Sequence, residues 1–192
     1  MRTPSEAVVT EVLAAASRLL EHGGPEALTI RGIARDAGVA PMSVYNHFDG
    51  KDGVIDSLIT EGFHRLRDEL EAAGREPDPE AALREAGLLY RRLALDAPAI
   101  YRLMYQRPLE ELASRSGVAD AGAEAFAALV LLVHRVQFAH GISEDPTTAA
   151  QAIWSMVHGW VALELAGKVF AEDPERSFEQ LIGAGLHLAR TH

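Results

Sequence analysis

The chain contains no cysteine, which excludes disulfides, thiol nucleophiles and every metal site built on thiolates. Aromatic residues make up only 6% of the 192 residues. The longest apolar run, 125–133, falls far short of the roughly twenty residues that span a bilayer. The first residues lead directly into a helical pattern and lack the apolar segment of a secretory signal. We therefore expect a soluble, cytoplasmic protein without a membrane partner.

Positive charge is scarce: 18 basic residues oppose 28 acidic residues, giving a formal net charge of −10. An acidic chain has no overall electrostatic attraction for nucleic acid. Any function in nucleic-acid binding must therefore depend on a local site.

Helical signals follow one another along the whole chain, and no segment reads as a convincing strand. Apolar residues recur at a helical period over 9–20 and 55–70, and further helical stretches cover 97–106 and about 119–140. Thr3-Pro4, Asp78-Pro79, Asp145-Pro146 and Asp173-Pro174 each pair a capping side chain with a proline, which needs no hydrogen bond at a first helical position. The sequence predicts an all-α fold of about nine helices.

A glycine and two prolines interrupt the helical pattern at 73–79. Downstream helices are longer and more apolar, and 126–133 is apolar on nearly all sides, as in a helix buried in a bundle. We expect a small N-terminal domain at 1–49, a connecting helix at 50–74 and a larger helical domain at 75–192.

Residues 28–52 carry the most specific pattern in the chain. Thr29 is placed to cap a two-turn helix, and Gly38 supplies the left-handed conformation of a sharp turn. A second short helix begins near Pro41. The spacing of Ala34, Gly38 and Val44 is that of a helix-turn-helix, in which the second helix enters the major groove of DNA.

Lys51, one of only two lysines, occupies the first turn of the next helix, where the helix dipole disfavours a cation. This placement indicates an external anion such as a phosphate. The alternative is an ion pair with Asp49 or Asp52. Side chains that can also donate to phosphate surround the second short helix: Thr29, Tyr45 and His47.

These residues resemble a known family. Thr-Ile-Arg-Gly-Ile-Ala at 29–34, Ala-Gly-Val at 37–39 and Val-Tyr-Asn-His-Phe-Asp-Gly-Lys-Asp at 44–52 resemble the DNA-binding domain of TetR-family transcriptional regulators. Trp154, His158 and Gly159 are similar to the Trp-x-x-x-His-Gly signature of one class of regulatory domain in that family. The two motifs bracket most of the chain.

The resemblance implies a homodimer that binds a pseudo-palindromic operator, most simply as a repressor released by a small organic effector. Position by position, it implies base contacts from Arg31, from Pro41 to Ser43 and from Tyr45, and phosphate contacts from Thr29, His47 and Lys51. The full predicted DNA-binding set is Thr29, Arg31, Ala40, Pro41, Met42, Ser43, Tyr45, Asn46, His47 and Lys51. The basic N-terminal arm of many family members is missing here. We therefore expect tight binding only on the protein's own operator.

The second half of the chain contains an aromatic, sparsely polar set suited to an uncharged ligand: Tyr90, Tyr101, Met104, Tyr105, Phe126, His134, Gln137, Trp154 and His158. His134 and Gln137 are expected on one helix face, lining the cavity together. For any single residue of the set, including His158, ordinary core packing is the better explanation.

The last two helices each have a second apolar stripe, which in the family arrangement faces the partner subunit. The predicted dimer residues are Ile153, Trp160, Phe178, Leu181, Gly185 and Leu188. The same stripes also fit the core of a single chain.

Catalytic signatures are lacking. Glu61 and His64 form one Glu-x-x-His, but a di-iron bundle needs a second copy and two more glutamates. We expect no catalytic residues, metal or cofactor. The remaining alternative is a helical module that binds a small molecule or a partner and reads no DNA sequence.

Overall fold

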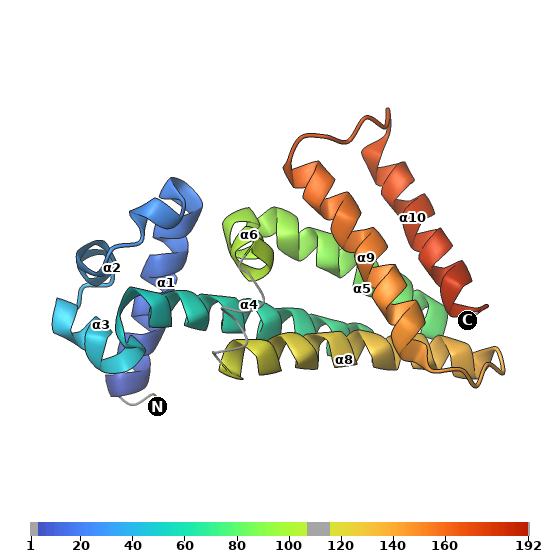
Figure 1. The fold of residues 1–192 in the computed structure, drawn as a ribbon, viewed down its shortest axis with the longest axis horizontal. Helices are drawn as coiled ribbons and strands as arrows, with labels where there is room; N and C mark the ends of the chain where they lie inside the picture. The colour runs from blue at the N-terminus through green and yellow to red at the C-terminus, as the bar shows by residue number, and fades with distance from the viewer. Residues whose placement is uncertain (1–3, 107–115, 192) are drawn as a thin grey trace. The chain divides into compact units, whose positions relative to one another are not determined.

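The computed structural model describes residues 4–106 and 116–191, and every regular element in these ranges is helical. Nine α-helices and one 3₁₀ turn at Pro25–Ala27 are present, with no strand in the described residues (Figure 1). The all-α prediction is confirmed. The helices are α1 Pro4–Gly23, α2 Ile30–Asp36, α3 Pro41–Phe48, α4 Gly50–Ala73, α5 Pro79–Asp96, α6 Pro98–Gln106, α8 Ser116–Ala139, α9 Pro146–Leu165 and α10 Pro174–Ala189.

Three of the predicted Asp-Pro starts form as expected. A carboxylate oxygen of Asp145 accepts from the backbone N–H of Thr147 at 2.9 Å, and one of Asp173 accepts from Arg176 at 3.0 Å. Asp78 accepts from the N–H of Glu80 at 3.1 Å. The fourth predicted cap, Thr3, lies outside the described residues.

Helix α9 ends at Leu165, before the apolar residues Val169 and Phe170. Gly167 has a φ of 66°, the left-handed conformation that closes a helix. The N–H of Lys168 then donates to the carbonyl of Leu163 at 2.8 Å. Apolar residues continue past this glycine in the sequence, so the apolar pattern alone does not locate the end of α9.

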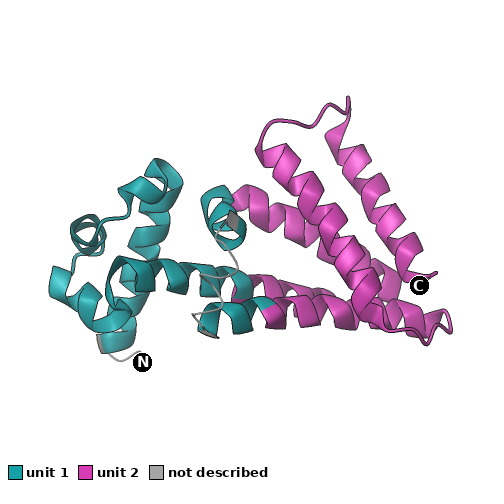
Figure 2. Cartoon of the chain, viewed as in Figure 1, with its two compact units in different colours: residues 1–63, 97–122 teal, residues 64–96, 123–192 magenta. Residues whose placement is uncertain are grey.

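The chain divides into two compact units, residues 1–63 with 97–122, and residues 64–96 with 123–192 (Figure 2). This division differs from the predicted boundary at 73–79 in two respects. Helix α4 contributes its first half to unit 1 and its second half to unit 2, and α6 belongs to unit 1. The physical reason is that Leu103 and Met104 of α6 are buried in the same apolar cluster as α1 to α4.

The core of unit 1 is built from the inward stripe of each short helix. Val12, Leu20, Ile33, Val44 and Ile59 come from four different helices, and each is at most 1% exposed. A core shared by four helices holds α2 and α3 at a fixed angle, although neither is long enough to be stable alone.

The core of unit 2 joins α5, α8, α9 and α10. Each helix supplies a fully or nearly fully buried stripe, with Ala82 and Ala86 from α5, Val133 and Val136 from α8, Val157 and Val161 from α9, and Phe178 and Ile182 from α10. At Gly87 of α5, an added Cβ would overlap the side chain of Ile182, so this glycine permits the close approach of α5 and α10.

Helix α8 is long and apolar enough to cross a membrane by length and composition, with a mean hydropathy of 1.5 over 117–139. The core helix of a soluble protein passes the same test. Arg135 on α8 donates to the carbonyl oxygens of Gly74 and Glu76 at 2.6 and 2.7 Å, and Arg67 of α4 pairs with Glu124 at 2.6 Å. These polar contacts and the buried valines join α8 to the other helices of unit 2.

Candidate functional site

The α2–turn–α3 segment is held by local contacts that the sequence predicted, the Thr29 cap and the Gly38 turn. The hydroxyl of Thr29 accepts from the N–H of Gly32 at 3.1 Å and caps α2. Gly38 has a φ of 68°, and the N–H of Val39 donates to the carbonyl of Ala34 at 2.9 Å across the turn. The predicted helix-turn-helix geometry is therefore present in unit 1.

Burial of Val44 and Phe48 sets the rotation of α3 about its axis. Val44 is 0% exposed and Phe48 is 7% exposed, so the opposite face of α3 points to solvent. Met42 is 64% exposed and Tyr45 is 54% exposed, which is unusual for side chains of this size. The predicted set is otherwise exposed at Thr29, Arg31, Ala40, Pro41, Asn46 and His47, and half-buried at Ser43 and Lys51.

An ion pair behind the turn was not foreseen from the sequence. Nε and Nη2 of Arg18 on α1 donate to the same carboxylate oxygen of Asp36 at 3.1 and 2.8 Å. Asp36 is the last residue of α2. The pair neutralises a carboxylate close to the turn, which lowers the electrostatic cost of bringing this segment to an anion.

Lys51 does not form the ion pair with Asp49 or Asp52 that was the alternative, as far as the described residues show. Its Nζ instead donates to the backbone carbonyl of Pro25 at 3.3 Å. A carbonyl carries no formal charge, so the ammonium charge is not neutralised by this bond. The contact ties the start of α4 to the 3₁₀ turn and leaves a positively charged group at the side of α3.

The junction between α3 and α4 is unusually tight. Asp49 has a φ of 52° and Gly50 a φ of 89°, so the chain turns through two consecutive left-handed residues. A Cβ added to Gly53 would overlap the carbonyl group of Phe48, which is main chain and has no rotamer to move. Close main-chain packing therefore fixes α3, the second helix of the helix-turn-helix, to the start of α4.

Part of the predicted ligand set lies in unit 1, on α6. Tyr101 and Met104 are each 7% exposed, and Tyr105 is half-buried. The ring of Tyr105 lies 5.0 Å from that of Tyr101 and packs edge-on against Phe63 of α4 at 5.8 Å. These residues form an aromatic cluster within the unit that carries the helix-turn-helix.

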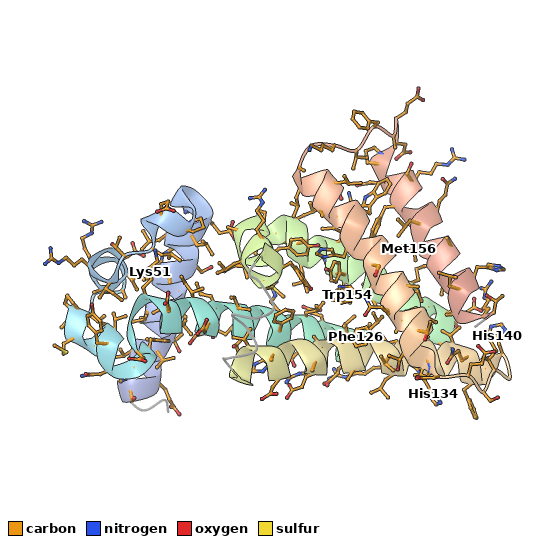
Figure 3. All side chains as sticks on the ribbon, in the orientation of Figure 1. Lys51, Phe126, His134, His140, Trp154 and Met156 are labelled. Atoms are coloured by element: carbon orange, nitrogen blue, oxygen red, sulfur yellow. The ribbon has the colours of Figure 1, made fainter. Side chains whose placement is uncertain are left out.

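The other part lies in unit 2 and includes one polar cluster. The Tyr90 hydroxyl oxygen lies 2.9 Å from Nδ1 of His158 and accepts from the indole N–H of Trp154 at 3.4 Å. Burial lowers the pKa of His158 below its ordinary value of 6.5. Phe126 of α8 adds an apolar wall, with its ring 5.8 Å from that of Trp154 (Figure 3).

His134 and Gln137 are neighbours three residues apart on α8, as predicted for one helix face, but they differ in burial. His134 is exposed and its ring lies 6.4 Å from that of Phe138, whereas Gln137 is fully buried. Residues three apart are about 60° apart around a helix, and the edge of the buried stripe of α8 falls between these two.

The predicted dimer residues also divide. Ile153, Phe178 and Gly185 are buried within the single chain, and Gly185 faces Ile153 with 3.6 Å between the Ile153 side chain and an added Cβ. These three residues form the α9–α10 contact of one chain and are unavailable to a partner. Trp160, Leu181 and Leu188 are half-buried.

The ion pair between Arg91 and Glu164, next to α10, was not predicted from the sequence. Nε and Nη2 of Arg91 on α5 donate to the two oxygens of Glu164 on α9 at 2.7 and 2.6 Å, and both side chains are less than one fifth exposed. The guanidinium also lies 5.3 Å from the ring centre of Phe178. The only signal in the sequence was a charge on the margin of each apolar stripe.

Comparison with known families identifies both halves of the chain. Residues 12–58 match the family described as bacterial regulatory proteins, tetR family. Residues 83–184, more than half of the chain, match the family described as tetracyclin repressor-like, C-terminal domain. Both are families of regulators rather than enzymes. The C-terminal match does not name the Trp-x-x-x-His-Gly class, so that part of the resemblance stays a prediction.

Individual relatives agree with this result. An HTH-type transcriptional regulator of Mycobacterium tuberculosis is 29% identical over 200 residues, covering 98% of this chain and 86% of the relative. The HTH-type transcriptional repressor KstR2 of Rhodococcus jostii is 40% identical over 50 residues, 26% of this chain and 24% of the relative. A protein of unknown function from Rhodococcus sp. RHA1 has a similar structure, with a TM-score of 0.79, 26% identity and coverage of 95% and 93%.

Proposed function

Since the chain belongs to the TetR family of bacterial transcriptional regulators, we propose that it is a homodimeric repressor released from its operator by a small organic molecule. The observation that carries this proposal is the outer face of α3, which exposes Met42 and Tyr45 from a helix anchored by Val44 and Phe48. A regulator of this kind works where the chromosome is, so we place it in the cytoplasm.

Operator binding is supported by the division of α3 into a buried and an exposed side. Large exposed side chains on a rigid helix are suited to contact base edges, while Lys51 and His47 at its end are suited to phosphates. Ala40, Pro41 and Met42 have few hydrogen-bonding groups. We expect them to read shape and thymine methyl groups more than donor and acceptor patterns.

The repressor role is supported by similarity to the Rhodococcus jostii repressor. Most simply, a bound dimer at a promoter excludes polymerase, and the effector relieves this block.

Dimerisation through α9 and α10 is supported by two open positions. A Cβ added to Gly159 or to Gly183 would have no atom of the chain within 4 Å. Glycines that face open space on neighbouring helices allow the helices of a second copy to approach closely. Leu163, which is 50% exposed on α9, would be covered in such a dimer. Two reading helices must then lie about 34–36 Å apart to enter successive major grooves.

The effector is proposed to bind beside Tyr90, Trp154 and His158 in unit 2, with Phe126 as an apolar wall. Because burial lowers the pKa of His158, its imidazole is neutral at physiological pH and gives no charge to an anionic ligand. The predicted set contains no arginine or lysine. We therefore propose an uncharged, weakly polar effector. Contacts of Tyr101, Met104, Tyr105 and Gln137 with it remain predictions.

Selection of binding sites from a random DNA pool tests the proposal. We expect a pseudo-palindromic sequence that also occurs upstream of the protein's own gene, and retardation of that fragment in a gel by nanomolar protein. If the full-length protein selects no sequence, the alternative of a helical module that does not read DNA replaces this proposal.

A further inference from the structure

Helix α6 begins without a capping side chain of its own. The residue before Pro98 is Ala97, whose carbonyl accepts the first helical hydrogen bond, from the N–H of Tyr101 at 3.0 Å. The first N–H groups of a helix have no partner within the helix, and an alanine side chain cannot accept from them. The N–H groups of Ala99 and Ile100 therefore need an acceptor from elsewhere.

Glu21 of α1 supplies that acceptor from 78 residues away. Its Oε1 accepts from the N–H of Ala99 and from the N–H of Ile100, each at 3.2 Å, and its Oε2 also accepts from Ala99 at 3.2 Å. A carboxylate is favoured at this position because the N-terminus of a helix carries partial positive charge. Both helices lie in unit 1, so the contact is internal to that unit.

A second contact fixes α6 on the other side, against α4. A Cβ added to Gly62 would lie 2.7 Å from the sulfur of Met104 and 3.3 Å from Cγ2 of Ile100. Any larger residue at position 62 would require the Met104 side chain to move, so glycine favours this close packing of α6 on α4. Helix α6 is thus held by the carboxylate of Glu21 on α1 and by the close approach at Gly62 on α4.

We propose that Glu21 is a positioning residue for operator binding, which sets α1, and with it α2 and α3, against the start of α6. Glu21 is in the last turns of α1, and α1 packs on α2 and α3 through the core of unit 1. Without the carboxylate, the end of α1 and the start of α6 lose their polar contact, and the helix-turn-helix loses one of its supports. This inference rests on the proposed function.

Operator binding and the contact between Glu21 and α6 must affect each other equally if they are coupled. If the contact between Glu21 and α6 favours operator binding, operator binding must favour the contact by the same factor. The amides of Ala99 and Ile100, which exchange with solvent only when the cap opens, should exchange more slowly in the operator complex. Operator binding stabilises the folded state as a whole, so a cap that contributes to stability alone would be protected only as much as the other amides of unit 1.

The test compares Glu21→Ala and Glu21→Gln with the control Glu11→Ala, which removes an exposed acid from the same helix. Operator affinity is measured on the selected sequence and corrected for the folded fraction from thermal melts. We expect Glu21→Ala to bind at least fivefold more weakly, Glu21→Gln to bind with intermediate affinity because it retains one acceptor oxygen, and Glu11→Ala to bind within twofold of wild type.

Hydrogen exchange of Ala99 and Ile100 is measured in the wild-type protein, free, with operator and with a scrambled duplex. Protection by the operator alone is expected. If Glu21→Ala folds and binds within twofold of wild type, or if the operator slows exchange of Ala99 and Ile100 no more than that of the other amides of unit 1, Glu21 is only a structural cap. If Glu21→Ala does not fold, Glu21→Gln and the exchange measurement decide. A wild-type protein that selects no operator overturns the proposed function as well, so the two failures are distinguishable.

Discussion

The hydroxyl oxygen of Tyr90 lies 2.9 Å from Nδ1 of His158, which joins the middle of α5 to the middle of α9. The neutral imidazole accepts a hydrogen bond at one nitrogen only, so this contact depends on the protonation state of His158. The same oxygen accepts a hydrogen bond from the indole N–H of Trp154. These three side chains are the polar centre of an otherwise apolar region, and two predictions concern them directly.

The stability of unit 2 should fall as the pH drops below 6.5. Burial lowers the pKa of His158 in the folded protein, so between its folded and ordinary pKa values the unfolded chain binds a proton that the folded chain does not. Stability is therefore full above pH 6.5 and declines until the pH reaches the folded pKa. Urea unfolding at pH 7.5 and 5.5 should show a smaller decline for His158→Gln than for wild type. Equal declines would show that His158 does not titrate abnormally.

Trp154→Ala and His158→Ala should abolish effector-induced release while leaving operator affinity in the absence of effector within about twofold. The residues lie in unit 2, apart from the α3 face, so truncating them removes differential contacts with the effector alone. The measurement is release from labelled operator by uncharged compounds first found with the wild-type protein. Release of both variants at wild-type concentrations would show that the Trp154 and His158 side chains are only core.

Gly53→Ala should destabilise unit 1 by about 2 kcal/mol or more and abolish operator binding, because its Cβ would overlap main-chain atoms of Phe48. Gly122→Ala is the matched control. A Cβ at position 122 would lie 3.7 Å from the ring of Phe63, an ordinary contact, so this change should stabilise α8 by about 0.5–1 kcal/mol. Thermal melts of both variants test the pair, and similar melting temperatures would contradict the tight junction.

Arg91→Met should destabilise the protein by about 2 kcal/mol, because it leaves the partly buried carboxylate of Glu164 without its bidentate partner. The double variant Arg91→Met with Glu164→Leu removes both charges and should recover most of the loss. Urea unfolding of the three proteins at one pH gives the comparison. A double variant as unstable as the single one would show that the packing of Arg91 on Phe178 matters more than its charge.

Lys51→Ala should weaken binding to all DNA sequences similarly and reduce the slope of log affinity against log salt by about two for a dimer. Arg31→Ala should instead relax preference at one base pair in each half-site. Affinities for operator and scrambled duplex at several salt concentrations separate the two effects. If Arg31→Ala weakens both duplexes equally, Arg31 contacts the backbone.

The helix-turn-helix was predictable because its signals are local. Thr29 accepts from the N–H of Gly32, only three residues away, and the turn depends on the left-handed conformation of the single residue Gly38. Each interaction is therefore encoded within a few sequence positions. The three Asp-Pro starts were predictable for the same reason.

Contacts between distant segments were not predictable. Glu21 and Ala99 are 78 residues apart, and Arg91 and Glu164 are 73 apart, so no spacing rule joins them. The different burial of His134 and Gln137 was not predictable for another reason. Periodicity locates a helix face only to within about one residue, and here the edge of the buried stripe falls between them.

The membership of α6 in unit 1 has a practical consequence for engineered sensors. A hybrid regulator would join the DNA-binding part of one protein to the effector-binding part of another. The simplest junctions follow the helix-turn-helix or the connecting helix α4. In this chain, either junction would separate Leu103 and Met104 from the apolar cluster that they share with Val12 and Ile59. A hybrid that keeps unit 1 intact must therefore include two segments of this chain, residues 1–63 and residues 97–122.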